Sequence, residues 1–112
     1  MAGFVKGDVV VLPFPFSDMS SSKRRPALVL ASSGASDYIL SQITSKNVGD
    51  SIAVEVDATD FASGGLNAAS NIRPNKLFTA DMSIIAYKAG SLTPEKIAEV
   101  VSAITKLLEN GA

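Results

Sequence analysis

The feature that most restricts the fold of this chain is its series of short β-type segments separated by turn residues. Four segments are rich in β-branched and apolar side chains, and Gly, Asn, Asp, Ser and Pro lie between them. We expect strands at 9–12, 26–31, 38–45 and 52–56. Several short strands in succession predict a small, partly closed β-barrel or a strongly curved sheet.

A single segment has the spacing of an amphipathic helix, and it lies at the C-terminal end. Thr93 suits the N-cap, Pro94 the first helical position, and Glu95 the positive end of the helix dipole. The apolar residues that follow recur at i, i+3, i+4 and i+7, which predicts one buried face. These residues are Ile97, Val100, Val101, Ile104, Leu107 and Leu108. We interpret this helix as a lid over the sheet.

Two segments are harder to assign to elements. In 57–70, Gly64 and Gly65 predict a loop, with a short helix near 57–64 beside it. In 70–85 we expect two short extended pieces broken at Pro74, because proline cannot donate a hydrogen bond to a sheet.

Length and composition indicate one globular domain, 1–112. The chain has 112 residues, of which 46% are hydrophobic and 19% charged. A chain of this size buries roughly 60 to 70% of its unfolded surface, so its stability can depend on a partner subunit. There is no Cys and no His, which excludes disulfides, thiolate metal sites and a histidine base. No apolar run approaches the ~20 residues of a membrane span, and we expect a cytoplasmic protein.

Positive charge is concentrated in the first part of the chain. The formal net charge is -1, which argues against a broadly basic nucleic-acid-binding protein. Lys23, Arg24 and Arg25 nevertheless stand together before Pro26 and a predicted buried strand. A guanidinium binds phosphate oxygens through two parallel hydrogen bonds, so an anion clamp is one interpretation and a solvated loop end is the other. Because Pro26 restricts Arg25 to extended backbone, we expect Arg25 to be the most rigidly placed cation.

A hydroxyl on the next predicted strand forms a second candidate. Side chains alternate between the faces of a strand, so Thr44 shares a face with Gln42, opposite Ile43. If the second and third strands pair, Thr44 approaches Arg25. The alternative is that Thr44 is simply a good β-forming residue.

Further candidates for nucleic-acid contact are two aromatic and two cationic residues. Phe14 and Phe16 lie in the same loop region as the cations and are candidates for base stacking, although core packing is the alternative. Arg73 and Lys76 offer a second cationic point, with a surface ion pair as the other interpretation. The acids at 55–60 have no spacing typical of a metal site or a catalytic pair.

Three stretches of the sequence together resemble a known family. They are GDVVVLPFPFSDMSSSKRRPALVLAS, the later QITS, and NIRPNKLFTADMSII. This combination resembles the MazF/PemK family of type II toxin–antitoxin toxins, in particular its PemK-like branch. The resemblance extends from Gly7 to about Leu108.

The resemblance implies an SH3-like β-barrel of the MazF/PemK/CcdB type with a C-terminal helix. It also implies a homodimer that cleaves single-stranded RNA without a metal, a cofactor or the ribosome. A cognate antitoxin would place its disordered tail in the RNA groove, and operator DNA would be bound only by the toxin–antitoxin complex. By position, the family's catalytic arginine corresponds to Arg25 and its catalytic Thr or Ser to Thr44.

Metal-independent RNA cleavage is compatible with a chain that has no Cys and no His. The ribose 2'-OH attacks the adjacent phosphorus and a cyclic phosphate remains, so the protein need not provide a nucleophile. Arg25 would stabilise the added negative charge. Lys23, Arg24, Phe14, Phe16, Gln42, Arg73 and Lys76 are the predicted RNA-binding residues.

A noncatalytic barrel is the alternative from another functional class. Such a protein would bind a protein target in the manner of a gyrase poison, or would bind only its antitoxin. An enzyme requires Arg25 and Thr44 in one groove, whereas such a binding protein requires neither.

Overall fold

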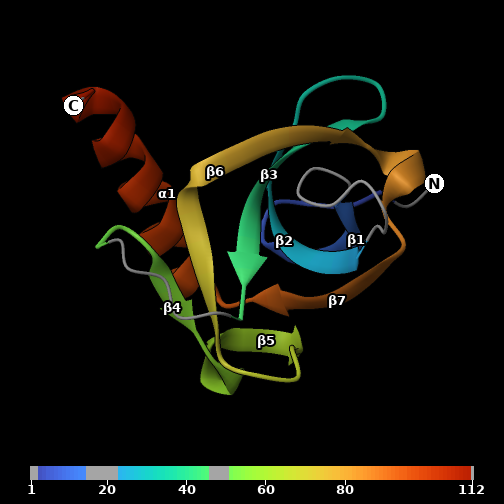
Figure 1. Cartoon of the computed structure of the whole chain (residues 1–112), viewed down its shortest axis with the longest axis horizontal. Coiled ribbons are helices and arrows are strands. Elements are labelled where there is room, and N and C mark those ends of the chain that lie inside the picture. Colours follow the sequence, from blue (N-terminus) through green and yellow to red (C-terminus); the bar gives the residue numbers. More distant parts are fainter. Residues whose placement is uncertain (1–2, 15–22, 46–50, 112) are drawn as a thin grey trace.

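The computed structural model describes residues 3–14, 23–45 and 51–111, and its seven strands form one antiparallel sheet beside a long helix (Figure 1). The strands are β1 (Asp8–Phe14), β2 (Lys23–Ser32), β3 (Asp37–Thr44), β4 (Val54–Val56), β5 (Phe61–Gly64), β6 (Ser70–Asp81) and β7 (Tyr87–Leu92). Two single-turn 3-10 helices, η1 (Ala58–Asp60) and η2 (Met82–Ile84), and the helix α1 (Pro94–Asn110) complete the fold.

The sheet curls into a half-barrel. Its strand order is β4-β6-β3-β2-β1-β7-β5, and every neighbouring pair is antiparallel. The predicted mainly β fold with one C-terminal helix is therefore confirmed. β1 is an interior strand that is almost wholly buried, and it lies between β2 and β7. Residues near 25 in β2 and residues near 87 in β7 are therefore separated by this one strand.

Two apolar clusters form the core, one on each face of the sheet. Val9 and Val10 are adjacent in β1 but belong to different clusters, as strand alternation requires. In β3, Ile43 packs in the first cluster while Tyr38 and Leu40 pack in the second. The predicted alternation of β3 is confirmed at these positions.

Helix α1 covers the first cluster. Thr93 accepts a hydrogen bond from the Lys96 amide at 3.3 Å, and Gly111 ends the helix with φ of 64°. Val100 is fully buried, so the predicted packing of the helix on the sheet is confirmed. Leu108 was wrongly assigned to the buried face and is 69% exposed, because eight residues of helix rotate it about 80° from Val100.

Several predicted boundaries differ from the structure: β1 extends to Phe14 instead of ending at 12, β3 ends at Thr44 instead of 45, and β4 begins at Val54 instead of 52. β2 begins at Lys23 instead of 26, because Lys23, Arg24 and Arg25 pair with the end of β1. β6 continues through Pro74 as one strand, contrary to the predicted break. Its register against β3 shifts between Ser41 and Ile43, so the residues around the proline need no regular ladder partner. The helix expected near 57–64 is one turn, η1, followed by β5.

Within the described ranges, α1 is the longest helix, and no helix there has the length and apolarity needed to cross a bilayer.

Candidate functional site

Arg25 lies near the start of β2, at the end of the sheet where the three cations pair with β1. It is paired with Leu12, and its side chain is half-buried, whereas Lys23 and Arg24 are exposed. Pro26 follows it within the strand and pairs with Val11. The expected rigid placement of Arg25 is consistent with this position, because a central buried strand supports its backbone.

Thr44 is the last residue of β3 and is 8% exposed. β2 and β3 are paired, with Ala27 opposite Gln42, so the condition for Thr44 to approach Arg25 is met. In an antiparallel pair, going two residues back along β2 from Ala27 corresponds to going two residues forward along β3 from Gln42. Two residues beyond the Ala27–Gln42 pair, Arg25 and Thr44 therefore occupy facing positions on the same side of the sheet.

Arg25 and Thr44 line one pocket, which we call the Arg25–Thr44 pocket. Its volume is about 340 Å³. The residues that line it come from β1, β2, β3, β7, the start of β6 and the segment between β5 and β6. They are Val11, Arg24, Arg25, Pro26, Ile43, Thr44, Ser45, Leu66, Asn67, Ala68, Ser70 and Tyr87.

The chemistry of the pocket favours an anion. Two cationic residues, Arg24 and Arg25, contribute to the lining, and among the described residues no Asp or Glu does. Hydroxyl groups of Thr44, Ser45 and Ser70 add neutral hydrogen-bonding groups. The Ser70 hydroxyl donates to the Ala68 carbonyl at 3.0 Å, so a phosphate group in this pocket would meet positive charge together with the hydroxyl-bearing residues Thr44 and Ser45.

The other predicted RNA-binding residues lie outside this lining. Gln42 is half-buried and Lys76 is exposed, and neither borders the pocket. Arg73 is half-buried in β6, where its carbonyl accepts a hydrogen bond from the Ser41 hydroxyl at 2.6 Å. Lys23 is exposed at the first position of β2.

Of the two phenylalanines predicted to stack on bases, the structure describes only Phe14. Phe14 is 4% exposed and packs edge-to-face on Phe78, with 5.1 Å between ring centroids, so its predicted base-stacking role is wrong. The ring is buried because Phe14 continues the inward alternation of Val10 and Leu12. Phe16 lies outside the described residues.

Four polar residues of the pocket were not among the predicted site residues: Ser45, Asn67, Ser70 and Tyr87. Tyr87 is 53% exposed, and Asn67 is exposed in the segment between β5 and β6. The available signal for Tyr87 was a single tyrosine between Ala86 and Lys88. Its place in the same pocket as Arg25 follows only from the pairing of β1 with both β2 and β7.

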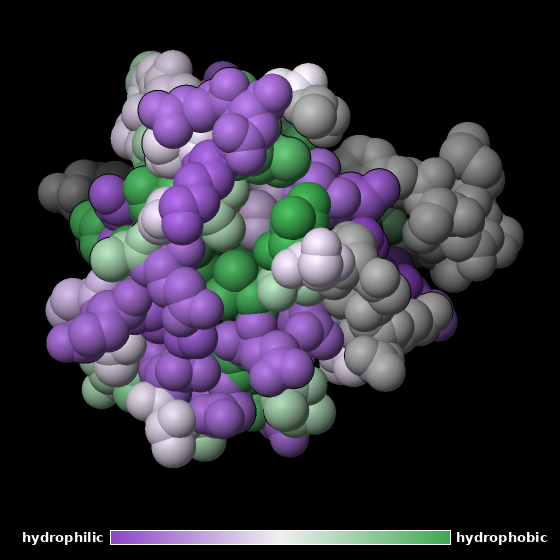
Figure 2. All heavy atoms as spheres, turned by 90° about the vertical axis from the view of Figure 1, so that its left-hand side faces the viewer, coloured by the Kyte–Doolittle hydropathy of each residue, from purple (hydrophilic) through white to green (hydrophobic). Residues whose placement is uncertain are grey.

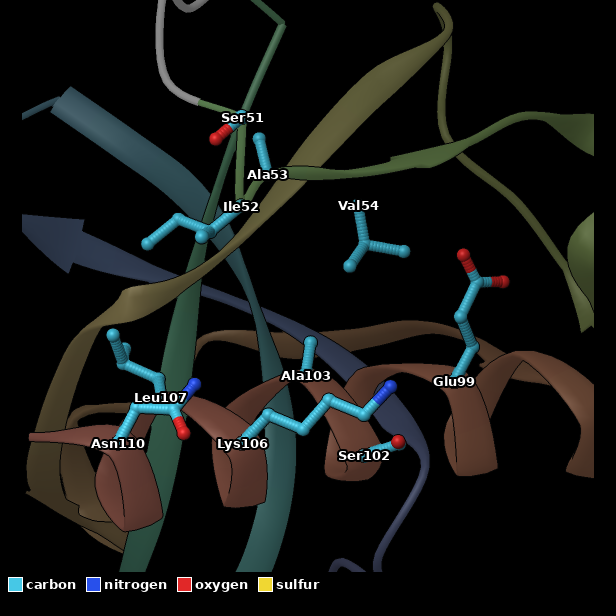
Figure 3. Close-up of a pocket in the computed structure, with 10 residues that line it drawn as sticks. All are labelled: Ser51, Ile52, Ala53, Val54, Glu99, Ser102, Ala103, Lys106, Leu107 and Asn110. Atoms are coloured by element: carbon cyan, nitrogen blue, oxygen red, sulfur yellow. The ribbon is translucent and has the colours of Figure 1, made fainter.

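A larger hollow, of about 550 Å³, lies between α1 and residues 51–54 (Figure 3). Figure 3 shows Ile52 and Val54 on one side and Ala103 and Leu107 on the other, with Lys106 extended along the helix. On this face of the molecule, hydrophilic side chains form a band beside hydrophobic patches (Figure 2). We place the reactive site in the Arg25–Thr44 pocket instead, because among the residues that the structure describes no arginine lines the larger hollow, and its lining includes the carboxylate of Glu99.

The acidic residues near 55–60 are engaged in structural contacts. The Lys96 ammonium lies 3.0 Å from the Glu55 carbonyl and 3.8 Å from the Asp60 carboxylate, and so ties α1 to β4 and η1. Asp57 caps η1, and hydrogen bonds from the side chain and backbone of Thr59 lower the pKa of its carboxyl group.

The fold closely matches solved toxin structures. MazF of Deinococcus radiodurans superposes with a TM-score of 0.76 at 23% identity, over 97% of this chain and 99% of that one. Toxin MazF-mt6 of Mycobacterium tuberculosis gives 0.71 at 19% identity, over 91% and 96%. An endoribonuclease in complex with its cognate antitoxin, from a mycobacterial species, gives 0.73 at 14% identity, over 97% and 96%. At these identities the likeness shows a shared fold.

A search of curated proteins found no match to this chain. The family comparison did: residues 5–108 match the sequence model of the PemK-like, MazF-like toxins of type II toxin–antitoxin systems. This match covers nearly the whole chain and agrees with the half-barrel fold. The chain therefore belongs to the family of PemK-like, MazF-like type II toxins.

Proposed function

We propose that this protein is an endoribonuclease toxin that cleaves single-stranded RNA in the Arg25–Thr44 pocket. The observation that most supports this proposal is that a half-buried arginine and a buried threonine, from separate strands, line one pocket without a carboxylate among its described residues. Family membership and the endoribonuclease among the solved structures of similar fold support the same activity.

The reaction we propose is attack by the ribose 2'-oxygen on the adjacent phosphorus. The 2'-O–P bond forms, the P–O5' bond breaks, and the products are a 2',3'-cyclic phosphate and a 5'-hydroxyl. The 2'-OH loses its proton and the leaving 5'-oxygen gains one. Guanidinium groups stay protonated in proteins, so Arg25 acts by stabilising the charge on the phosphate oxygens and not as a base. Thr44 donates a hydrogen bond that orients the phosphate.

Substitutions at both positions test this proposal. RNA is incubated with purified protein in chelator, and the products are mapped by primer extension. Loss of one preorganised donor costs about 10²- to 10³-fold in rate, so we expect Arg25→Ala to reduce cleavage by that factor. Thr44→Val, which keeps the shape and removes the hydroxyl, should lower the rate, whereas Thr44→Ser should retain most of it.

Lys106→Ala provides the matched control, because Lys106 is an exposed cation on α1 and borders a different hollow. Its cleavage rate should equal that of the wild type. Cleavage by Arg25→Ala at the wild-type rate would rule out the proposed site. If the wild type leaves RNA intact, the noncatalytic binding function replaces this proposal.

We also propose that an acidic segment of a cognate antitoxin occupies the same pocket. Two exposed or half-buried arginines at its rim favour carboxylates as well as phosphates. Solved structures of similar fold include complexes with cognate antitoxin and MazE. Such a segment would compete with RNA, and operator DNA would be bound through the complex.

A homodimer in the cytoplasm completes the proposal. This part of the proposal rests on family membership and on the small size of the domain, whose stability can depend on a partner subunit. Light scattering during gel filtration measures the molar mass and tests this assembly.

A further inference from the structure

Tyr87 is an aromatic residue at the edge of the Arg25–Thr44 pocket. Its ring is 53% exposed at the first position of β7 and contributes to the pocket lining. The other tyrosine, Tyr38, is 7% exposed, and its hydroxyl accepts a hydrogen bond from the Phe4 amide. Tyr87 thus presents a large flat surface to solvent without a corresponding role in the core clusters.

The strand register places Tyr87 at a definite distance from the cations. Val11 pairs with Pro26 on one side and with Tyr87 on the other. Neighbouring strands are about 4.8 Å apart, so the backbones of Pro26 and Tyr87 are separated by roughly 10 Å. Because Tyr87, Arg24 and Arg25 line the same pocket, a nucleotide whose phosphate lies there would have its own or its neighbour's base within reach of the tyrosine ring.

The segment between β5 and β6 contributes another part of the pocket lining. Leu66 is half-buried and packs against the first core cluster, which anchors this segment. Asn67 follows it and is exposed in the lining. A side-chain amide offers two donors and an acceptor, which suit the edge of a base. The pocket therefore combines a cationic part, an aromatic face and an amide.

We propose that Tyr87 stacks on an RNA base next to the scissile phosphate and that Asn67 hydrogen-bonds to the edge of that base. This inference rests on the proposed function and adds the base-binding subsite to it. Stacking tolerates any base because all bases have a π face, whereas the amide distinguishes among them. Tyr87 then supplies affinity, and Asn67 supplies preference at one position of the cut site.

Tyrosine fluorescence gives a direct test of stacking. The chain has two tyrosines and no tryptophan, so tyrosine emission reports on Tyr38 and Tyr87. The probe is a 2'-O-methyl RNA oligonucleotide, which lacks the nucleophilic 2'-OH and stays intact. Its addition should quench the emission of the wild type. In Tyr87→Phe, which leaves only the buried Tyr38, the same addition should leave the emission unchanged.

Cleavage kinetics supply the second measurement. Loss of a stacked base costs about ten- to hundredfold in binding, so Tyr87→Ala should raise KM by that factor with a smaller change in kcat. Tyr87→Phe keeps the ring and should cleave nearly as well as the wild type. Ile84→Ala is the matched control, because Ile84 is 47% exposed on η2 and does not line the pocket. Asn67→Ala should alter the base preference at one position of the cut site.

The outcomes separate this inference from the proposed function. If the wild type cleaves RNA but Tyr87→Ala has an unchanged KM, or Tyr87→Phe is as impaired as Tyr87→Ala, the stacking role is overturned while the nuclease remains. Unquenched emission at saturating oligonucleotide overturns it as well. An unchanged cut-site preference in Asn67→Ala removes the edge-reading part. A wild type that neither binds nor cleaves RNA overturns the proposed function itself.

Discussion

Replacing Asp8 with alanine should destabilise the fold by about 3 kcal/mol, because this buried carboxylate joins three segments. Asp8 is 3% exposed at the start of β1. Its Oδ2 accepts a hydrogen bond from the Val5 amide at 2.9 Å, and its Oδ1 accepts one from the Ser91 hydroxyl at 3.1 Å. The Lys88 ammonium lies 3.4 Å from Oδ1.

The magnitude follows from these contacts. A hydrogen bond to a charged group contributes about 1.5 to 3 kcal/mol, and the lower value applies here because Ser91 can regain water in the variant. Two such bonds give about 3 kcal/mol. The ion pair adds less than about 1 kcal/mol because the Lys88 side chain is 46% exposed. For a chain of this length, the loss corresponds to a decrease in Tm of roughly 10 to 15 °C.

Urea unfolding of a double-mutant cycle measures this effect. The cycle combines Asp8→Ala with Ser91→Ala, and the two residues should be coupled by about 1 kcal/mol. Asp8→Asn, which keeps the size and one acceptor, should be less destabilised than Asp8→Ala. If Asp8→Ala lowers the free energy of unfolding by less than about 1 kcal/mol, the proposed role of Asp8 in joining Val5, β1 and β7 is refuted. Additive effects of Asp8→Ala and Ser91→Ala would refute it as well.

Two further predictions concern a carboxylate and a glycine. The hydroxyl of Ser36, followed by hydrogen bonds from Ser83, lowers the pKa of Asp81 from 3.8 to about 2. Because the folded-state pKa is the lower one, Asp81 stabilises the fold above about pH 4, and this contribution is lost as the pH falls towards 2. Asp81→Asn should therefore flatten the dependence of stability on pH between 2 and 4 in urea unfolding, and an unaltered profile would contradict this. Gly64→Ala should cost about 2 kcal/mol or more, since Gly64 has φ of 66° and an added Cβ would collide with the backbone of β7. Gly65→Ala, where the Cβ would meet nothing within 4 Å, should leave the melting temperature nearly unchanged, so equal losses in the two variants would disprove the steric argument.

The candidate site was partly predictable because two of its parts depend on local rules. Pro26 restricts Arg25 to extended backbone, and alternation along β3 assigns Thr44 to the face opposite Ile43. Phe14 was misplaced because the strand was expected to end at residue 12, whereas β1 continues to Phe14 and alternation along it buries the ring. Tyr87 could not be placed by any local rule.

Sequence alone determined the elements that depend on near neighbours in the chain. The Thr93 cap, the helical repeat of α1 and most strand positions follow from interactions within a few residues, and the structure confirms them. The tertiary structure decided which strands pair and in what register, because pairing depends on side chains from distant segments that must share one core. Only that register brings Arg25, Thr44 and Tyr87 into one pocket.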